Sequence, residues 1–234
     1  MPALHVPGEE IDGVVHYRPL HSERAQPGAI MVDRVGRRFV DEAQNYGEVG
    51  RAMRAVAGGM AAPCWLVFDA GYRRRYPVGP LEPGTPDPAW LTRAADLDAL
   101  AATLGVDPGT LADSVTRFNA GAARGSDPDF GRGSLPYDRW IGDPSAPHPT
   151  LAPLCEPPFY AVAVHVGCMG TKGGPRTDDR GRVLSSRRAA VTGLYAAGNA
   201  AASPFGTATA AGGATLGPAL VFGYRAGEAA AGDP

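Results

Sequence analysis

The residues with the clearest capacity to hold an electron-rich ligand lie in two glycine-rich stretches near the end of this 234-residue chain. Residues 193–199 are Gly-Leu-Tyr-Ala-Ala-Gly-Asn, and residues 206–218 are Gly-Thr-Ala-Thr-Ala-Ala-Gly-Gly-Ala-Thr-Leu-Gly-Pro. Glycine permits close backbone approach, and a helix N-terminus offers unpaired N–H groups and a positive dipole end. The spacing is not the G-x-G-x-x-G fingerprint, so a simple packing turn explains it equally well.

The elements that must position these stretches follow from apolar patterning. A short strand precedes the first stretch, and a helix over 214–231 follows the second, with Pro218 early in it. Asp107 and Pro108 predict the start of another helix. We expect helices at 48–57, 96–104 and 108–123, strands at 64–69 and 159–166, and a hairpin of 29–32 with 38–40.

Two other segments suggest less chemistry. The histidines His5, His16 and His21 lie among polar, proline-broken residues and have no metal-ligand spacing, so no metal site is expected. Residues 72–77 are basic and aromatic, which suits either a phosphate or nucleic-acid patch or, as we favour, a solvated loop with two packed tyrosine rings.

Composition limits the class of protein. Apolar residues make up 44% and charged residues 20% of the chain, with a net charge of −2, so we expect a globular protein without a nucleic-acid partner. No apolar run is long enough to span a membrane, and the first residues lack signal-peptide features. The scattered cysteines, Cys64, Cys155 and Cys168, favour a reducing cytoplasm.

Several segments in a fixed order resemble the flavin-dependent 3-ketosteroid Δ1-dehydrogenases of the fumarate reductase/succinate dehydrogenase flavoprotein superfamily. These are residues 28–32, 36–42, 117–119, 129–133, 137–139, 158–161, 170–174, 193–199 and 213–218, with Tyr46. The resemblance implies an α+β catalytic (cap) domain over residues 1–170. It also implies that residues 171–234 are the C-terminal strand–loop–helix return segment of an α/β FAD-binding domain.

The resemblance further implies a C-terminal portion of an FAD-dependent oxidoreductase, because the family's N-terminal G-x-G-x-x-G segment has no counterpart here. We therefore expect a fragment that is inactive alone and needs an N-terminal FAD-binding half. That half is either a separate chain or a segment upstream of a mis-assigned start.

The family dehydrogenates a CH–CH bond next to a ring ketone of a steroid. Tyr46 matches its proton-abstracting tyrosine, and Gly213 matches the glycine whose N–H holds the ketone oxygen. The tyrosine that shares this oxygen in the family falls on Thr209, whose hydroxyl is a shorter and less acidic donor. The resemblance thus implies a steroid-like substrate with one altered contact.

For the cofactor, the resemblance implies FAD bound non-covalently. Gly198 and Asn199 match the segment that passes the ribityl and pyrophosphate groups. Ala214, Thr215 and Leu216 match the helix start whose N–H groups face the flavin, where a positive dipole end favours the reduced, anionic ring.

Two alternatives remain open. One is another chemistry of the superfamily, such as reduction of an unsaturated dicarboxylate, for which Arg34, Arg37 and Arg38 would supply charge. The other is an inactive remnant or a module that binds a flat apolar ligand. Whatever its chemistry, a chain that lacks the FAD-binding half is expected to expose apolar surface on its C-terminal segment, because that half normally covers it.

Overall fold

The computed structural model describes residues 1–56, 63–208 and 212–232. The chain divides into two compact units, Met1–Gly167 and Cys168–Pro234. The substrate-binding and cofactor-binding roles expected for 1–170 and 171–234 remain predictions. Among the described residues, no helix has both the length and the hydropathy needed to cross a lipid bilayer.

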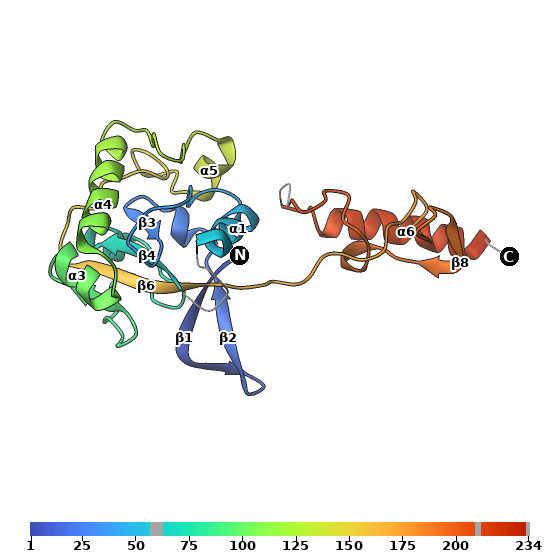
Figure 1. Ribbon diagram of the computed structural model, residues 1–234, viewed down its shortest axis with the longest axis horizontal. Helices are drawn as coiled ribbons and strands as arrows, with labels where there is room; N and C mark the ends of the chain where they lie inside the picture. Colours follow the sequence, from blue (N-terminus) through green and yellow to red (C-terminus); the bar gives the residue numbers. More distant parts are fainter. Residues whose placement is uncertain (57–62, 209–211, 233–234) are drawn as a thin grey trace. The chain divides into compact units, whose positions relative to one another are not determined.

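An antiparallel sheet organises the first unit (Figure 1). Within the described residues it has six strands, in the order β2-β1-β6-β4-β3, and β5 also pairs with β6. The strands are β1 (Pro2–Ile11), β2 (Val14–Pro19), β3 (Ala29–Val32), β4 (Cys64–Asp69), β5 (Thr92–Ala94) and β6 (Phe159–Val166). The strands predicted at 64–69 and 159–166 are thereby confirmed.

Apolar side chains cover both faces of the sheet, because successive strand residues point to opposite sides. One core cluster contains Met31 and Phe68 and packs against α1 (Tyr46–Val56) and α2 (Ala70–Arg75). The other contains Ile30 and packs against α3 (Leu97–Leu104) and α4 (Pro108–Ala122). The sheet is therefore the middle layer between two sets of helices, with α5 (Pro136–Ile141) at one side (Figure 1).

The helix predicted after Asp107 is confirmed as α4. The Asp107 carboxylate accepts a hydrogen bond from the Thr110 N–H, and Pro108 occupies the first turn. Asp96 caps α3 in the same way through the Ala99 N–H. Both caps supply acceptors for N–H groups that have no partner within the helix.

The hairpin expected for residues 29–32 and 38–40 is wrong in its second half. Residues 39 and 40 form no strand, and the pairing at this turn is reduced to an isolated bridge between Val32 and Arg38. The Asp33 N–H donates to the Arg37 carbonyl at 2.9 Å, which closes a tight turn. The chain then leaves the sheet. The buried Glu42 side chain accepts a hydrogen bond from the Met31 N–H of β3, and its backbone does not continue the strand pairing.

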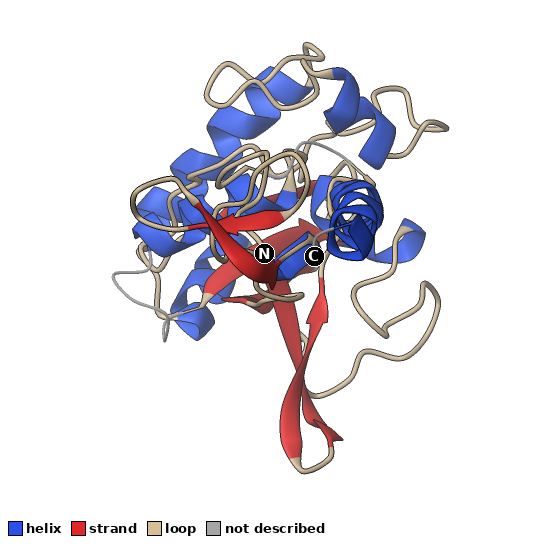
Figure 2. Cartoon of the chain, turned by 90° about the vertical axis from the view of Figure 1, so that its right-hand side faces the viewer, coloured by secondary structure: helices blue, strands red, loops and turns tan. Residues whose placement is uncertain are grey.

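A second hairpin was not expected. Strands β1 and β2 pair through a turn at Asp12 and Gly13, both with positive φ, and this long hairpin extends beyond the remaining strands (Figure 2). Pro7 lies where the pairing register shifts between His5 and Glu10, so its missing N–H breaks no regular ladder.

The second unit has a small core. The antiparallel pair β7 (Arg182–Leu184) and β8 (Ala190–Tyr195), the short 3-10 helix η2 (Gly198–Ala200) and α6 (Leu216–Gly232) make up its regular structure. Among its described residues, the buried apolar side chains are Val183, Ala201 and Ala226.

The outer face of α6 carries large apolar side chains in water. Leu216, Leu220 and Tyr224, one turn apart, are 70%, 72% and 69% exposed. Val191 and Leu194 of β8 are also exposed. Such a surface is typical of an element that packs against another polypeptide segment.

Candidate functional site

The candidate proton-accepting residue, Tyr46, is the first residue of α1 and is half-buried. The carbonyl of Asn45 accepts the N–H groups of Glu48 and Val49, and its side chain accepts the Gly47 N–H at 2.8 Å. The Tyr46 ring meets the His21 ring nearly edge to face, with centroids 5.8 Å apart. The start of α1 therefore has a defined cap and places a phenol beside an imidazole.

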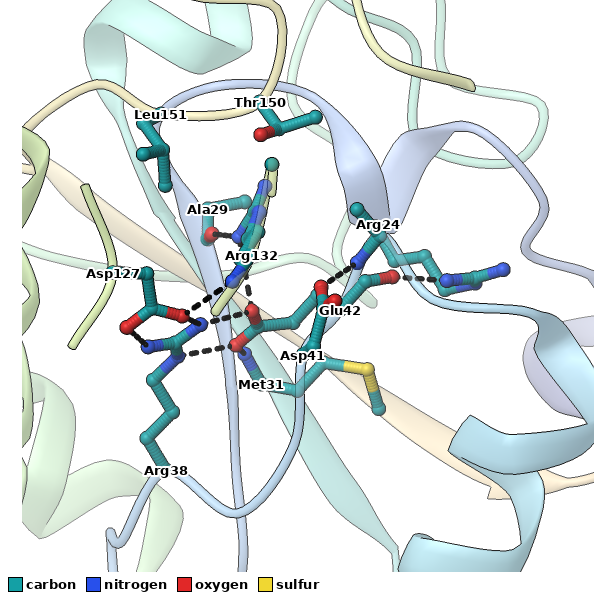
Figure 3. A network of polar contacts seen from close by, with 12 residues as sticks. Arg24, Ala29, Met31, Arg38, Asp41, Glu42, Asp127, Arg132, Thr150 and Leu151 are labelled. Carbon is teal, nitrogen blue, oxygen red and sulfur yellow. Dashed lines mark hydrogen bonds and ion pairs between the residues drawn. The ribbon is translucent and has the colours of Figure 1, made fainter. Parts of the chain in front are cut away.

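The segment that leads to Tyr46 is held by buried ion pairs (Figure 3). The Arg38 guanidinium donates to the two carboxylate oxygens of Glu42 at 2.9 and 2.7 Å, and to Asp127 at 2.7 and 2.8 Å. Arg132 donates to Glu42 at 3.1 Å, and Glu42 also accepts the Met31 N–H. These contacts tie the segment to β3 and to the loop containing residues 127–132.

Electrostatics explains why these charges are stable in the interior. Burial opposes ionisation of Glu42, but Arg38 and Arg132 outweigh it and hold the pKa of Glu42 below its usual value. Burial likewise opposes the charge of Arg38, but Glu42 and Asp127 outweigh it and raise the pKa of Arg38. Glu42 and Arg38 are therefore charged across the ordinary pH range, although Nε of Arg132 has no hydrogen-bond partner among the described residues.

Asp41, beside this network, behaves differently. Burial, together with the nearby charges of Asp138 and Glu42, raises the pKa of Asp41 to about 7. One oxygen of Asp138 accepts N–H groups from Gly133 and Leu135. The other is buried and has no hydrogen-bond partner in the described part of the chain. Asp41 therefore changes protonation near neutrality.

The tyrosines of the basic segment are core residues, as the packed-ring interpretation of 72–77 expected, although residues 70–75 form a helix instead of a loop. The Tyr72 hydroxyl donates to the Glu23 carbonyl at 2.7 Å, and Tyr76 donates to Asp143 at 2.8 Å. Burial raises the pKa of Tyr76 to about 12 and that of Tyr72 as well. Neither phenol is suited to accept a proton.

The residues expected to hold the cofactor lie in the second unit. Gly198 and Asn199 form the start of η2, with Gly198 at φ +61°. A side chain at Gly198 would approach Ala219 of α6 to 3.0 Å, so η2 and α6 are close neighbours. The Gly173 N–H donates to the Asn199 carbonyl, which brings the loop at 170–174 to the same place.

The second glycine-rich stretch forms the turn before α6. Gly213 has φ +83°, and a Cβ added there would meet nothing within 4 Å. Ala214 and Thr215 continue the turn, Leu216 begins the helix, and the Gly217 N–H donates to the Gly213 carbonyl. Thr209 lies outside the described residues.

Two features of the second unit bear on ligand binding. Arg176, Gly198, Pro218 and Arg225 contribute to the lining of an open hollow of about 460 Å³. In the described ranges no three His, Cys, Asp or Glu side chains are grouped to hold a metal ion. Asp178 and Asp179 also line the hollow, so it presents charges of both signs to a ligand.

The structure brings together the expected cofactor residues 198–199 and 213–216 within one unit, whereas Tyr46 belongs to the other unit. Sequence reasoning missed His21 as a neighbour of Tyr46 and missed the roles of Glu42 and Arg132. The only signal for the network was the four-residue spacing of Arg38 and Glu42.

The profile of the FAD binding domain family matches residues 2–216. The chain belongs to this family. Membership implies FAD as the cofactor, and the segments that carry the glycine turns lie within or at the end of the matched range.

Related proteins narrow the comparison. The chain is 41% identical to 4-oxocyclohexanecarboxylate 2-dehydrogenase of Sinomonas cyclohexanicum, over 98% of this chain and 41% of that protein. It is 42% identical to 3-oxosteroid 1-dehydrogenase of Mycobacterium tuberculosis (strain ATCC 25618 / H37Rv), over 88% of this chain and 39% of that protein. The chain thus spans about two fifths of the length of these relatives, and it is homologous to 3-ketosteroid 1-dehydrogenases.

A solved structure agrees with this assignment. The crystal structure of 3-ketosteroid delta1-dehydrogenase from Sterolibacterium denitrificans, in complex with 1,4-androstadiene-3,17-dione, matches with a TM-score of 0.90 and 42% identity. The match covers 100% of this chain and 43% of that protein. The mixed α/β architecture is therefore that of a steroid dehydrogenase.

Of the arginines considered for a dicarboxylate site, Arg37 and Arg38 border one hollow, which Arg117, Asp113 and Asp129 also line. Arg38 is buried and bound to Glu42 and Asp127, whereas Arg34 and Arg37 are exposed beside the turn. A guanidinium already bound to two carboxylates is a poor receptor for a third. This arrangement argues against the dicarboxylate alternative.

Proposed function

We propose that this chain supplies the substrate-binding part and the C-terminal cofactor-binding part of an FAD-dependent dehydrogenase that acts on a CH–CH bond next to a ring ketone. The carrying observation is the match over nearly the whole chain to two relatives whose names both describe oxidation of a ring ketone. A steroid-like ketone is the substrate we favour, because the structural match at a TM-score of 0.90 is to a steroid dehydrogenase.

In this proposal, Tyr46 accepts the proton from the carbon next to the ketone. A tyrosine suits this role when it is accessible, and Tyr46 is half-buried where Tyr72 and Tyr76 are enclosed. The N–H of Gly213 and the hydroxyl of Thr209 would donate to the ketone oxygen, which acidifies the neighbouring C–H. In keeping with this role, a Cβ built at Gly213 would meet no described atom within 4 Å.

The second unit fits an FAD of the non-covalent kind. The turn at 213–216 leads into the first turn of α6, where N–H groups lie near a positive dipole end, and η2 adds a glycine at positive φ in the same unit. The flavin, when bound, supplies the hydride-accepting ring. Residues 198, 199 and 214–216 would hold and orient it.

The exposed face of α6 supports a role for a further polypeptide. Leu216, Leu220 and Tyr224 form an apolar stripe, which we assign to packing against an N-terminal FAD-binding half. In this arrangement, residues 1–170 serve as the catalytic (cap) domain and residues 171–234 complete the FAD-binding domain. We also propose a cytoplasmic location, in keeping with the free Cys64, Cys155 and Cys168.

The decisive experiment is co-expression with a matching N-terminal FAD-binding half taken from a related dehydrogenase. We expect a yellow complex with stoichiometric flavin and dye-linked oxidation of a 3-ketosteroid. A panel containing 4-oxocyclohexanecarboxylate and fumarate then defines the substrate class.

Each outcome has a clear meaning. Oxidation of the cyclohexanone acid alone would retain the chemistry and replace the steroid by a small ring ketone. Activity confined to fumarate would favour the dicarboxylate reaction. A colourless mixture without turnover would reject the proposal and favour an inactive remnant.

A further inference from the structure

His21 lies against the candidate base from a different part of the chain. It follows β2 and is exposed, yet its imidazole meets the Tyr46 ring at 5.8 Å between centroids and an interplanar angle of 83°. Edge-to-face pairs of this kind are attractive because the positive ring edge meets the negative ring face. The contact therefore restricts the directions in which the Tyr46 phenol can point.

A buried arginine fixes the two backbone segments that carry these rings. The Nε of Arg24 donates to the Leu20 carbonyl at 3.3 Å, one residue before His21. Its Nη1 donates to the Gln44 carbonyl at 2.7 Å, two residues before Tyr46, and also to the Glu42 carbonyl. Arg24 is fully buried, so these bonds do not compete with water.

The 3-10 helix η1 (Glu23–Ala25) that carries Arg24 is itself anchored. The Tyr72 hydroxyl donates to the Glu23 carbonyl at 2.7 Å, and the His21 N–H donates to the Glu23 carboxylate at 2.9 Å. The backbone of His21 is therefore held on both sides. This backbone places the His21 side chain within reach of the Tyr46 ring.

We propose that His21 is a positioning residue for Tyr46: its imidazole holds the phenol in one orientation and thereby directs the hydroxyl towards the hydrogen to be removed. This inference rests on the proposed function of Tyr46. Arg24 keeps the two rings next to each other by binding the backbone segment before each of them. The substrate is a ring ketone, as above, and His21 does not itself accept the proton.

The first test uses the full chain without cofactor. Nuclear magnetic resonance of chain labelled at tyrosine and histidine should show a contact between the two rings and Hα–Hβ couplings of a single χ1 rotamer for Tyr46. His21→Ala should average these couplings, and His21→Phe should keep the single rotamer because it retains a ring. His16→Ala, which removes a histidine from β2, is the matched control and should change nothing at Tyr46.

An unchanged Tyr46 rotamer in His21→Ala, or the absence of a ring contact in the parent chain, would overturn the inference. Because this readout requires no flavin or turnover, it does not depend on whether the enzyme reaction has been assigned correctly.

The second test uses the complex with an N-terminal half. His21→Ala should lower kcat about tenfold with KM changed less than twofold, and His21→Phe should recover most of kcat, since misplacement of a reacting group penalises the chemical step. Full kcat in His21→Ala would overturn the inference while leaving the proposed function intact. Inactivity of the parent complex would instead reject the proposed function. The nuclear magnetic resonance test would then decide by itself whether His21 orients Tyr46.

Discussion

Arg38 binds Glu42 through two hydrogen bonds of 2.9 and 2.7 Å, and both side chains are buried. The pair lies four residues apart on a segment without regular structure, so its role is to fix a loop instead of supporting a helix. That loop ends at Tyr46, so the ion pair holds the backbone that leads to the candidate base.

The first prediction concerns this support. Glu42→Gln should lower the free energy of unfolding by about 3–5 kcal/mol, because it leaves the charges of Arg38 and Arg132 undercompensated in the interior. Urea denaturation of the chain measures the change. Glu48→Gln, which breaks a partly exposed pair with Arg51, should cost less than about 1 kcal/mol. Equal losses in the two variants would contradict the account.

The second prediction concerns pH. The folded chain raises the pKa of Asp41 from 3.8 to about 7, so the folded state binds a proton more tightly than the unfolded state. The resulting stabilisation is present below pH 4 and is lost as the pH rises towards 7; a shift of one pKa unit corresponds to ~1.4 kcal/mol.

The measurement is the thermal midpoint as a function of pH. Asp41→Asn retains an acceptor for the Ala43 N–H and removes the titration. We therefore expect the variant to lose less stability than the parent chain between pH 4 and pH 7. Glu42 and Asp127 have lowered pKa values, so both chains should lose stability in stronger acid. Parallel profiles across the neutral window would show that Asp41 does not titrate there.

The third prediction concerns turnover. In the complex with an N-terminal half, Tyr46→Phe should reduce kcat by roughly 10²–10⁴-fold, the usual contribution of a general base. The fold should be retained, because the ring stays in contact with His21. Tyr17→Phe, on the exposed face of β2, serves as the matched control and should keep full activity. Dye-linked assays give the rates, and near-wild-type turnover of the Tyr46 variant would exclude it as the base.

The fourth prediction concerns the chain by itself. Its exposed α6 stripe should cause self-association, and the chain alone should bind FAD weakly or not at all. Leu220→Glu should reduce association and weaken the complex with an N-terminal half, because it places a charge within the stripe. Ser186→Glu, on an exposed turn, is the control. Sedimentation shows the assembly state, and a stable monomer carrying stoichiometric flavin would refute the expectation.

Local signals predicted much of the fold. Asp107 and Pro108 marked α4 because capping is a nearest-neighbour effect, and the apolar runs at 64–69 and 159–166 marked strands buried on both faces. The hairpin at the N-terminus was predictable from Asp12-Gly13 between apolar residues, but the prolines concealed it.

Long-range contacts could not be predicted in the same way. Arginine side chains usually lie at the surface, so the sequence does not indicate that Arg38 and Arg132 are buried. Only the fold brings both of them to the carboxylate of Glu42. The contact between His21 and Tyr46 likewise depends on Arg24, which binds the backbone of two loops. No residue spacing in the sequence indicates this contact. The glycine turns were found from sequence because glycine itself is the signal, whereas the role proposed for them with Tyr46 rests on the family resemblance.

The ion-pair network also imposes an order on folding. Arg38 meets Asp127 across 89 positions of the chain, and Arg132 meets the Ala29 carbonyl across 103. Contacts of such separation form after local helices and hairpins, since long loops must first close. The loop that bears Tyr46 therefore acquires its final shape late. During refolding, helical content should return before Arg38 and Arg132 reach their buried partners.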